Sequence, residues 1–207
     1  MSHKNPDRIS EYEFSIGVRL THWIRFIAIT LLVVSGYYIS YVFMSPEITS
    51  EPTNFMQAKW RLAHQVAGFV LIAVFIFKFY LFVFDKHSKK EWMSVLDFLS
   101  PKVWIAQIKY YIFMGPHPHL RGVYNPLQFA SYFFFYVILA LICLTGLVLY
   151  AHVYHNGLGG AIYEPARYFE ELMGGLANVR TVHRICMWII MIFVPIHVYM
   201  AIFNAVK

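Results

Sequence analysis

Residues 181–203 read TVHRICMWIIMIFVPIHVYMAIF, an almost wholly apolar run that is long enough to cross a membrane as a helix. Two histidines, His183 and His197, stand fourteen residues apart within it. In a helix this spacing is about 3.9 turns and about 21 Å of rise, so both side chains lie on nearly one face at different depths. Because an ionisable residue inside a membrane is costly, each of these histidines marks a candidate functional site.

The whole chain has the composition of a membrane protein. Of its 207 residues, 59% are hydrophobic, 19% are aromatic and only 14% are charged, whereas soluble domains carry about 25% charged residues. The net charge of +6 is spread over loops rather than gathered in one patch, so a nucleic-acid partner is not indicated. We expect a single membrane domain over residues 1–207.

Four segments are long and apolar enough to span a membrane, at about 20–43, 62–84, 127–150 and 182–203. The polar stretch before the first segment lacks the apolar core of a cleaved signal peptide, so we expect that segment to stay in the protein as a helix. The expected fold is therefore all-α: an integral membrane four-helix bundle with an up-down-up-down topology.

The connections between the expected helices differ in character. The connection over about 85–126 contains WMSVLDFLSPKVWIAQIKYYIF, with apolar residues three and four positions apart and lysines between them. This pattern predicts one or two amphipathic stretches in the membrane interface, and a soluble loop is the alternative. The connection over about 151–181 is expected to hold a short helix around Pro165–Met173.

Lysine and arginine residues gather on one side of the expected bundle. The N-terminal flank, the 85–126 connection and the C-terminus hold most of them. The opposite side holds only Lys59, Arg61, Arg167, Arg180 and Arg184. Because cytoplasmic loops are enriched in these residues, both termini are expected in the cytoplasm.

Two more histidines, His22 and His64, lie near the starts of the first two segments. In an up-down-up-down bundle, His64 and His183 share the outer level, and His22 and His197 share the inner level. Neutral imidazole is a strong iron ligand, and helix bundles build cofactor sites from facing side chains. The four histidines therefore predict axial ligand pairs for two haems.

A structural role or a zinc site accounts less well for these histidines. A lone membrane histidine is more often a hydrogen-bonded residue between helices, but four at paired depths favour haem. Zinc needs ligands that converge on one point, and these histidines lie at two levels about 20 Å apart. Cys143 and Cys186 form no CxxC or CxxCH motif, so a haem would be of the non-covalent b type. Gly36, Gly68 and Gly146 would let a flat cofactor approach the helix backbone.

A dense polar run, HPHLRGVYNPLQ over residues 117–128, precedes the third segment. Such a run at the membrane surface suits a quinone headgroup, which needs hydrogen bonds and a proton donor. His119 could supply the proton, and Asn125 and Gln128 could bond the ring. The alternative is a capped helix start, with Asn125 as N-cap and Pro126 at the first helical position.

The remaining polar residues near the helix ends carry weaker indications. For the basic ones a role in setting topology is favoured, with the charged group reaching the interface. Six of them could instead bind haem propionates, Arg25, Lys78 and Arg121 on the inner side and Arg61, Arg180 and Arg184 on the outer side. His152 and His155 are expected at the surface, and His3 and His87 in polar flanks have no assigned function.

The chain resembles the b-type cytochrome subunit of membrane-bound nickel-iron hydrogenases, a family that is similar in turn to the gamma subunits of formate dehydrogenases. The resemblance covers nearly the whole chain. It rests on RLTHW around His22, WRLAHQVAG around His64, GVYNPLQFASY at the third segment, and the 181–203 stretch around His183 and His197. The stretch YNPLQ and the fourth segment favour the hydrogenase branch.

The resemblance implies a subunit in the bacterial cytoplasmic membrane that holds two haems b and passes electrons from an iron–sulfur small subunit to menaquinone or ubiquinone. It implies periplasmic small and large nickel-iron hydrogenase subunits as partners, with hydrogen activation left to them. The implied haem ligands are His22, His64, His183 and His197, and the implied quinone site contains His119, Asn125 and Gln128. The alternative is the cytochrome b subunit of a formate dehydrogenase or thiosulfate-reductase-like complex. A third hypothesis, from a different functional class, is a haem-free membrane anchor or small channel.

Overall fold

The computed structural model describes residues 15–44, 55–85, 88–116 and 118–205, and within these ranges it is all-helical. The prediction of an all-α fold with four apolar helices long enough to cross a membrane is confirmed. These long helices are α1 (Ile16–Ser40), α2 (Met56–Phe84), α5 (Pro126–Val153) and α8 (Leu176–Ala205).

The long helices begin earlier than the apolar spans predicted for them, because polar residues continue the helix beyond its apolar part. The α1 helix starts after Ser15, whose hydroxyl accepts a hydrogen bond from the Val18 amide at 3.4 Å. The α8 helix starts directly after Gly174 and Gly175, whose φ values of 79° and 102° end the preceding helix. Pro195 lies inside this helix, which continues past it to Ala205.

The amphipathic connection forms two short helices, α3 (Lys89–Phe98) and α4 (Pro101–Tyr111). Pro101 occupies the first turn of α4, where its missing amide proton leaves no hydrogen bond unmade. The helical character expected of this stretch is confirmed, and its position relative to the membrane surface stays a prediction.

The connection between α5 and α8 also contains two short helices, α6 (Leu158–Ala161) and α7 (Tyr163–Leu172). The second agrees with the helix expected around Pro165–Met173, although it begins earlier. The first was not predicted, because its glycines read as a turn. At Gly159 an added Cβ would stand 1.9 Å from the Tyr154 carbonyl oxygen, so only glycine allows this close approach.

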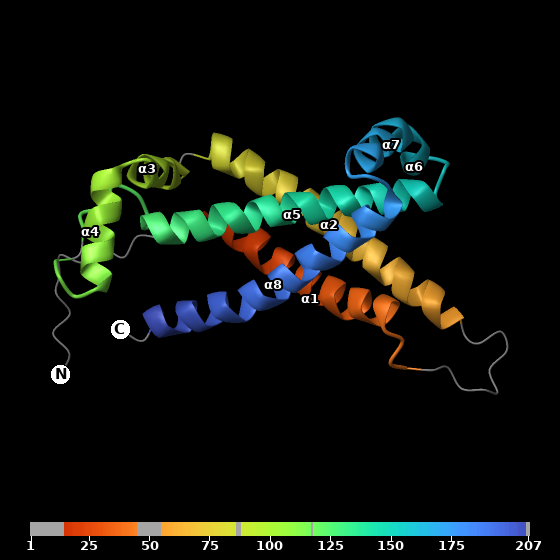
Figure 1. Ribbon diagram of the computed structural model, residues 1–207, viewed down its shortest axis with the longest axis horizontal. Helices are drawn as coiled ribbons and strands as arrows, with labels where there is room; N and C mark the ends of the chain where they lie inside the picture. The colour runs from red at the N-terminus through yellow and green to blue at the C-terminus, as the bar shows by residue number, and fades with distance from the viewer. Residues whose placement is uncertain (1–14, 45–54, 86–87, 117, 206–207) are drawn as a thin grey trace.

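The long helices pack as two pairs, α1 along α2 and α5 along α8. Figure 1 shows α3 and α4 at one end of these helices and α6 and α7 at the other. All four long helices contribute to one buried apolar cluster, which consists of Ala28, Ile29, Leu71, Phe135, Ile138, Leu139, Cys186 and Ile190. Along α1 and α8 this cluster lies between the two levels of histidines, so the apolar core separates two polar positions.

Candidate functional site

His64 of α2 and His183 of α8 lie against each other, with their ring centroids 6.3 Å apart and their planes at 66°. Two imidazoles that bind one metal ion at about 2 Å, with ring centroids about 1 Å beyond the nitrogens, have centroids about 6 Å apart. The separation therefore fits two imidazoles that would bind one iron ion. It agrees with the pairing by depth, while ligation itself stays a prediction.

A hydroxyl group from a neighbouring helix holds each ring of this pair. Ser35 Oγ of α1 lies 2.9 Å from His64 Nδ1, and Thr145 Oγ1 of α5 lies 2.9 Å from His183 Nδ1. Both hydroxyl residues are buried. Because Nδ1 of each ring is engaged, Nε2 is the nitrogen that can bind a metal.

Sequence reasoning missed Ser35 and Thr145. The available signal was a hydroxyl residue directly before a glycine, Ser35–Gly36 in α1 and Thr145–Gly146 in α5, each within an apolar helix. Such residues usually bond only the backbone of their own helix, so the pattern alone does not reveal a histidine partner.

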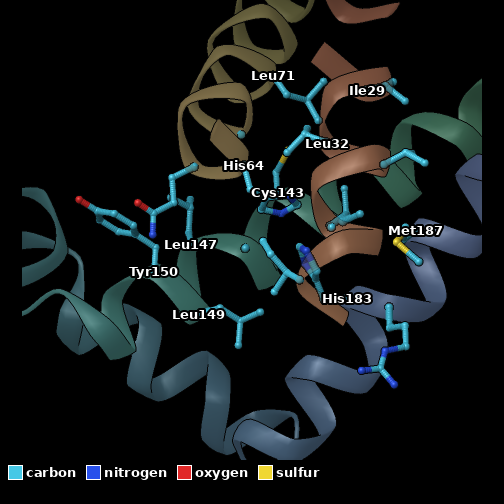
Figure 2. Close-up of a pocket in the computed structure, with 18 of the residues that line it drawn as sticks. Ile29, Leu32, His64, Leu71, Cys143, Leu147, Leu149, Tyr150, His183 and Met187 are labelled. Carbon is cyan, nitrogen blue, oxygen red and sulfur yellow. The ribbon is translucent and has the colours of Figure 1, made fainter. Parts of the chain in front are cut away.

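A cavity of about 460 Å³ surrounds His64 and His183 (Figure 2). Its walls come from all four long helices and are mostly apolar. The volume falls within the range of about 300–1,000 Å³ typical of small-molecule and cofactor sites. Gly36, Gly68 and Gly146 line it, as expected for a flat cofactor close to the backbone.

The second pair consists of His22 of α1 and His197 of α8, with ring centroids 6.2 Å apart and planes at 48°. Phe193 stacks on the His197 ring at 5.8 Å, and the Tyr132 ring meets it edge-on at 5.9 Å. His22 is exposed, whereas His64 and His183 are half-buried. The two pairs thus share their ring separation and differ in their enclosure.

The basic residues considered for propionate binding have different surroundings. Arg25 donates a hydrogen bond to the Tyr136 hydroxyl, and Lys78 Nζ lies 3.0 Å from Glu91 Oε1. Both therefore have partners within the protein. All three outer residues, Arg61, Arg180 and Arg184, are exposed. The two that line the cavity are Arg180 and Arg184.

The polar run before α5 begins that helix with a capping box. Asn125 Oδ1 accepts a hydrogen bond from the Gln128 amide at 2.9 Å, and Gln128 Oε1 accepts one from the Asn125 amide at 3.1 Å. The capping alternative is therefore confirmed, and a quinone role for both residues stays a prediction. His119 is exposed in the loop before the cap, and His117 lies outside the described residues.

Two buried residues of α3 anchor this loop. Asp97 Oδ2 accepts hydrogen bonds from the amides of Arg121 at 2.6 Å and Gly122 at 3.0 Å. Ser94 Oγ accepts one from the Tyr124 amide at 3.1 Å. A Cβ at Gly122 would lie 2.3 Å from the Ser94 amide nitrogen, so the loop backbone packs directly on α3. Sequence reasoning missed this anchor, because it depends on contact between segments far apart in the chain.

The other histidines agree with the sequence analysis where they are described. His152 and His155 are exposed, and His152 Nδ1 lies 3.9 Å from Glu170 Oε2. His3 and His87 lie outside the described residues. Within the described ranges, no three His, Cys, Asp or Glu side chains gather into a group that could hold a metal ion alone.

The chain is similar to known cytochrome proteins over nearly its full length. The family described as prokaryotic cytochrome b561 matches residues 13–207. The chain is 31% identical to the "Probable Ni/Fe-hydrogenase B-type cytochrome subunit" of Rhodobacter capsulatus, over 94% of this chain and 75% of that protein. It is 30% identical to the "Probable Ni/Fe-hydrogenase 1 B-type cytochrome subunit" of Escherichia coli (strain K12), over 98% of this chain and 86% of that protein. The "Probable Ni/Fe-hydrogenase B-type cytochrome subunit" of Azotobacter vinelandii is 31% identical, over 92% of this chain and 80% of that protein.

Proposed function

Because the chain belongs to the prokaryotic cytochrome b561 family, we propose that it is the di-haem b-type membrane subunit of a nickel-iron hydrogenase. In this role it passes electrons from an iron–sulfur partner subunit to a membrane quinone and anchors the complex. The observation that carries the proposal is the presence of two imidazole pairs, with centroids 6.2 and 6.3 Å apart, at two levels of one helix bundle.

The four histidines would hold the two haems. A b-type haem bound at each pair would supply a one-electron carrier. His64 and His183 would bind through Nε2, because their Nδ1 atoms are engaged by hydroxyl groups. The mostly apolar walls of the outer cavity suit the apolar body of a haem, and Arg180 and Arg184, which line it, offer positive charge to an anionic group. His22 and His197 would hold the second haem.

The arrangement of the pairs suits transfer across a membrane. His183 and His197 both lie on α8, about 21 Å apart along its axis, within an apolar layer about 30 Å thick. Successive long helices run in opposite directions in Figure 1, which supports an up-down-up-down topology. The distribution of lysine and arginine supports cytoplasmic termini in a bacterial inner membrane, although residues 1–14 and 206–207 lie outside the described ranges.

With this orientation, His64 and His183 lie on the periplasmic side, where iron–sulfur and nickel-iron partner subunits would dock. The curated relatives are named as cytochrome subunits of Ni/Fe hydrogenases, which supports this choice of partner over a formate dehydrogenase.

The quinone, either menaquinone or ubiquinone, would be reduced near the loop before α5. His119 is exposed there and would supply a proton. The side-chain oxygens of Asn125 and Gln128 are used in the capping box. Their amide NH2 groups would therefore be the donors to a quinone carbonyl, and the Asn125 group already lies 3.4 Å from the Tyr111 hydroxyl.

A spectrum of the purified complex tests the proposal. Reduced-minus-oxidised difference spectra are expected to show b-type bands equivalent to two haems per chain, reduced by hydrogen in the presence of co-purified partners. His119→Ala is expected to retain both haems and to slow quinone reduction. Absence of b-type bands, or full assembly and activity after replacement of all four histidines, would support a haem-free anchor instead. Co-purification with a formate-oxidising partner would move the chain to the alternative complex.

A further inference from the structure

The hydroxyl groups of Ser35 and Thr145 each make two kinds of contact. Ser35 Oγ lies 2.6 Å from the Leu31 carbonyl oxygen, in addition to its 2.9 Å contact with His64 Nδ1. Thr145 Oγ1 lies 2.8 Å from the Leu141 carbonyl oxygen and 2.9 Å from His183 Nδ1. Each hydroxyl thus lies between its own helix backbone and an imidazole of another helix.

Counting protons gives the direction of these hydrogen bonds. A hydroxyl has one proton to donate and can also accept, whereas a carbonyl oxygen can only accept. If the hydroxyl proton goes to the backbone carbonyl, the oxygen must accept from Nδ1–H of the histidine. Both His64 and His183 then carry their proton on Nδ1 and keep the lone pair of Nε2 for a metal.

The two contacts are built in the same way on two different helices. In both cases a glycine follows the hydroxyl residue and lies close to the ring that the hydroxyl contacts. A Cβ at Gly36 would lie 3.1 Å from His64 Cε1, and one at Gly146 would lie 3.5 Å from His183 Cε1. The α2 and α8 helices therefore supply the imidazoles. The α1 helix supplies a hydroxyl and a glycine next to His64, and the α5 helix supplies a hydroxyl and a glycine next to His183.

We infer that Ser35 and Thr145 are positioning residues that set the tautomer and ring plane of His64 and His183, and thereby lower the reduction potential of the haem that this pair would hold. The inference rests on the proposed function. A hydrogen bond from Nδ1–H makes an imidazole a stronger donor through Nε2. A stronger donor favours ferric over ferrous iron, which gives the direction of the effect. At the inner pair, His197 contacts the aromatic rings of Phe193 and Tyr132. The outer histidines instead contact the hydroxyl groups of Ser35 and Thr145.

Two single replacements remove the hydroxyls with little change of shape, Ser35→Ala and Thr145→Val. The membrane complex carrying each is titrated with redox mediators, and its low-spin ferric haems are examined by electron paramagnetic resonance. The outer signal is assigned as the one that His64→Ala removes. Each replacement is expected to raise the midpoint potential of the outer haem and to shift its resonance, because the ring is then free to turn. The inner signal is expected to stay unchanged.

Matched controls come from the same two helices. Like Ser35 and Thr145, Thr30 on α1 and Ser131 on α5 donate a hydrogen bond to the carbonyl four residues earlier. Their distances are both 2.9 Å, and both residues are exposed. Thr30→Ala and Ser131→Ala are expected to leave both signals unchanged. Thr145→Ser keeps the hydroxyl and is expected to keep the wild-type potential and resonance.

The possible outcomes separate this inference from the proposed function. Loss of the outer haem alone in both hydroxyl-free variants, with both haems kept in Thr145→Ser and the controls, also supports the inference. Should Ser35→Ala not accumulate, Thr145→Val decides by itself. Wild-type potential and resonance in both hydroxyl-free variants would overturn the inference while leaving the di-haem function intact. A wild-type complex without bis-imidazole signals would instead overturn the proposed function, and the inference with it.

Discussion

Lys78 of α2 and Glu91 of α3 form an ion pair in which Nζ lies 3.0 Å from Oε1, with only 12% and 9% of the two side chains exposed. Removal of one partner from such a pair leaves the other charge buried. We expect Glu91→Gln to destabilise the protein by about 3 kcal/mol. The double variant Lys78→Met with Glu91→Met should lose much less unfolding free energy, because neither charge is then left buried without its partner. Thermal unfolding in detergent, analysed as a double-mutant cycle, measures the difference.

The same variants test whether Lys78 binds a haem propionate. Because Lys78 already pairs with Glu91, haem content per chain is expected to stay unchanged in the double variant. Loss of one haem from Lys78→Met, with the fold retained, would show instead that its charge serves the cofactor.

The two histidines of α8 are expected to act independently. His197→Ala should remove the inner haem and leave the outer one, and His183→Ala should do the reverse, because each residue lies against a different partner ring. Haem quantification and difference spectra of the two variants measure this. If either variant loses both haems while the protein still accumulates, the two sites are not separate.

Gly36 and Gly146 are expected to differ in their tolerance of alanine. At Gly36 the added Cβ would lie 3.1 Å from His64 Cε1, so the ring would have to shift relative to the Ser35 hydroxyl. At Gly146 the added Cβ would lie 3.5 Å from His183 Cε1, which is ordinary van der Waals contact. Gly36→Ala should therefore lower outer haem content or shift its resonance, and Gly146→Ala should have the smaller effect. The opposite order would show that space for the cofactor, rather than contact with the ring, governs both positions.

The anchor of the loop before α5 provides a test of the quinone site. Asp97→Ala removes the acceptor for two loop amides, and Gly122→Ala places a methyl group within 2.3 Å of the α3 backbone. Both should displace the loop that carries His119. We expect hydrogen-dependent quinone reduction to fall by about tenfold to a hundredfold, as misplaced reacting groups commonly cause. Dithionite-reduced haem spectra serve as the control and should not change.

If quinone reduction survives in both Asp97→Ala and Gly122→Ala, the quinone binds elsewhere on the chain or on a partner. A parallel loss of haem would indicate that the loop supports the bundle rather than the quinone.

The positions that could be predicted from the sequence are those governed by one helix at a time. Hydropathy locates the four spans. The fourteen-residue interval between His183 and His197 places these two histidines on one helix face at two levels. The helix ends were less accurate, because polar residues in a first turn, such as Gln57 and Lys59 of α2, lower the hydropathy there. The bonds of Ser35 to His64 and of Asp97 to the 121–124 loop were not predictable, since they depend on how separate helices meet.

The α8 helix contributes one histidine to each pair, and this has a consequence for how the chain can vary. One residue inserted between His183 and His197 would turn the second ring by about 100° around the helix axis, away from His22 on α1. Substitutions can accumulate along this interval, but insertions and deletions cannot without parting one ring from its partner. The interval between these two histidines is therefore a register that must be kept at constant length.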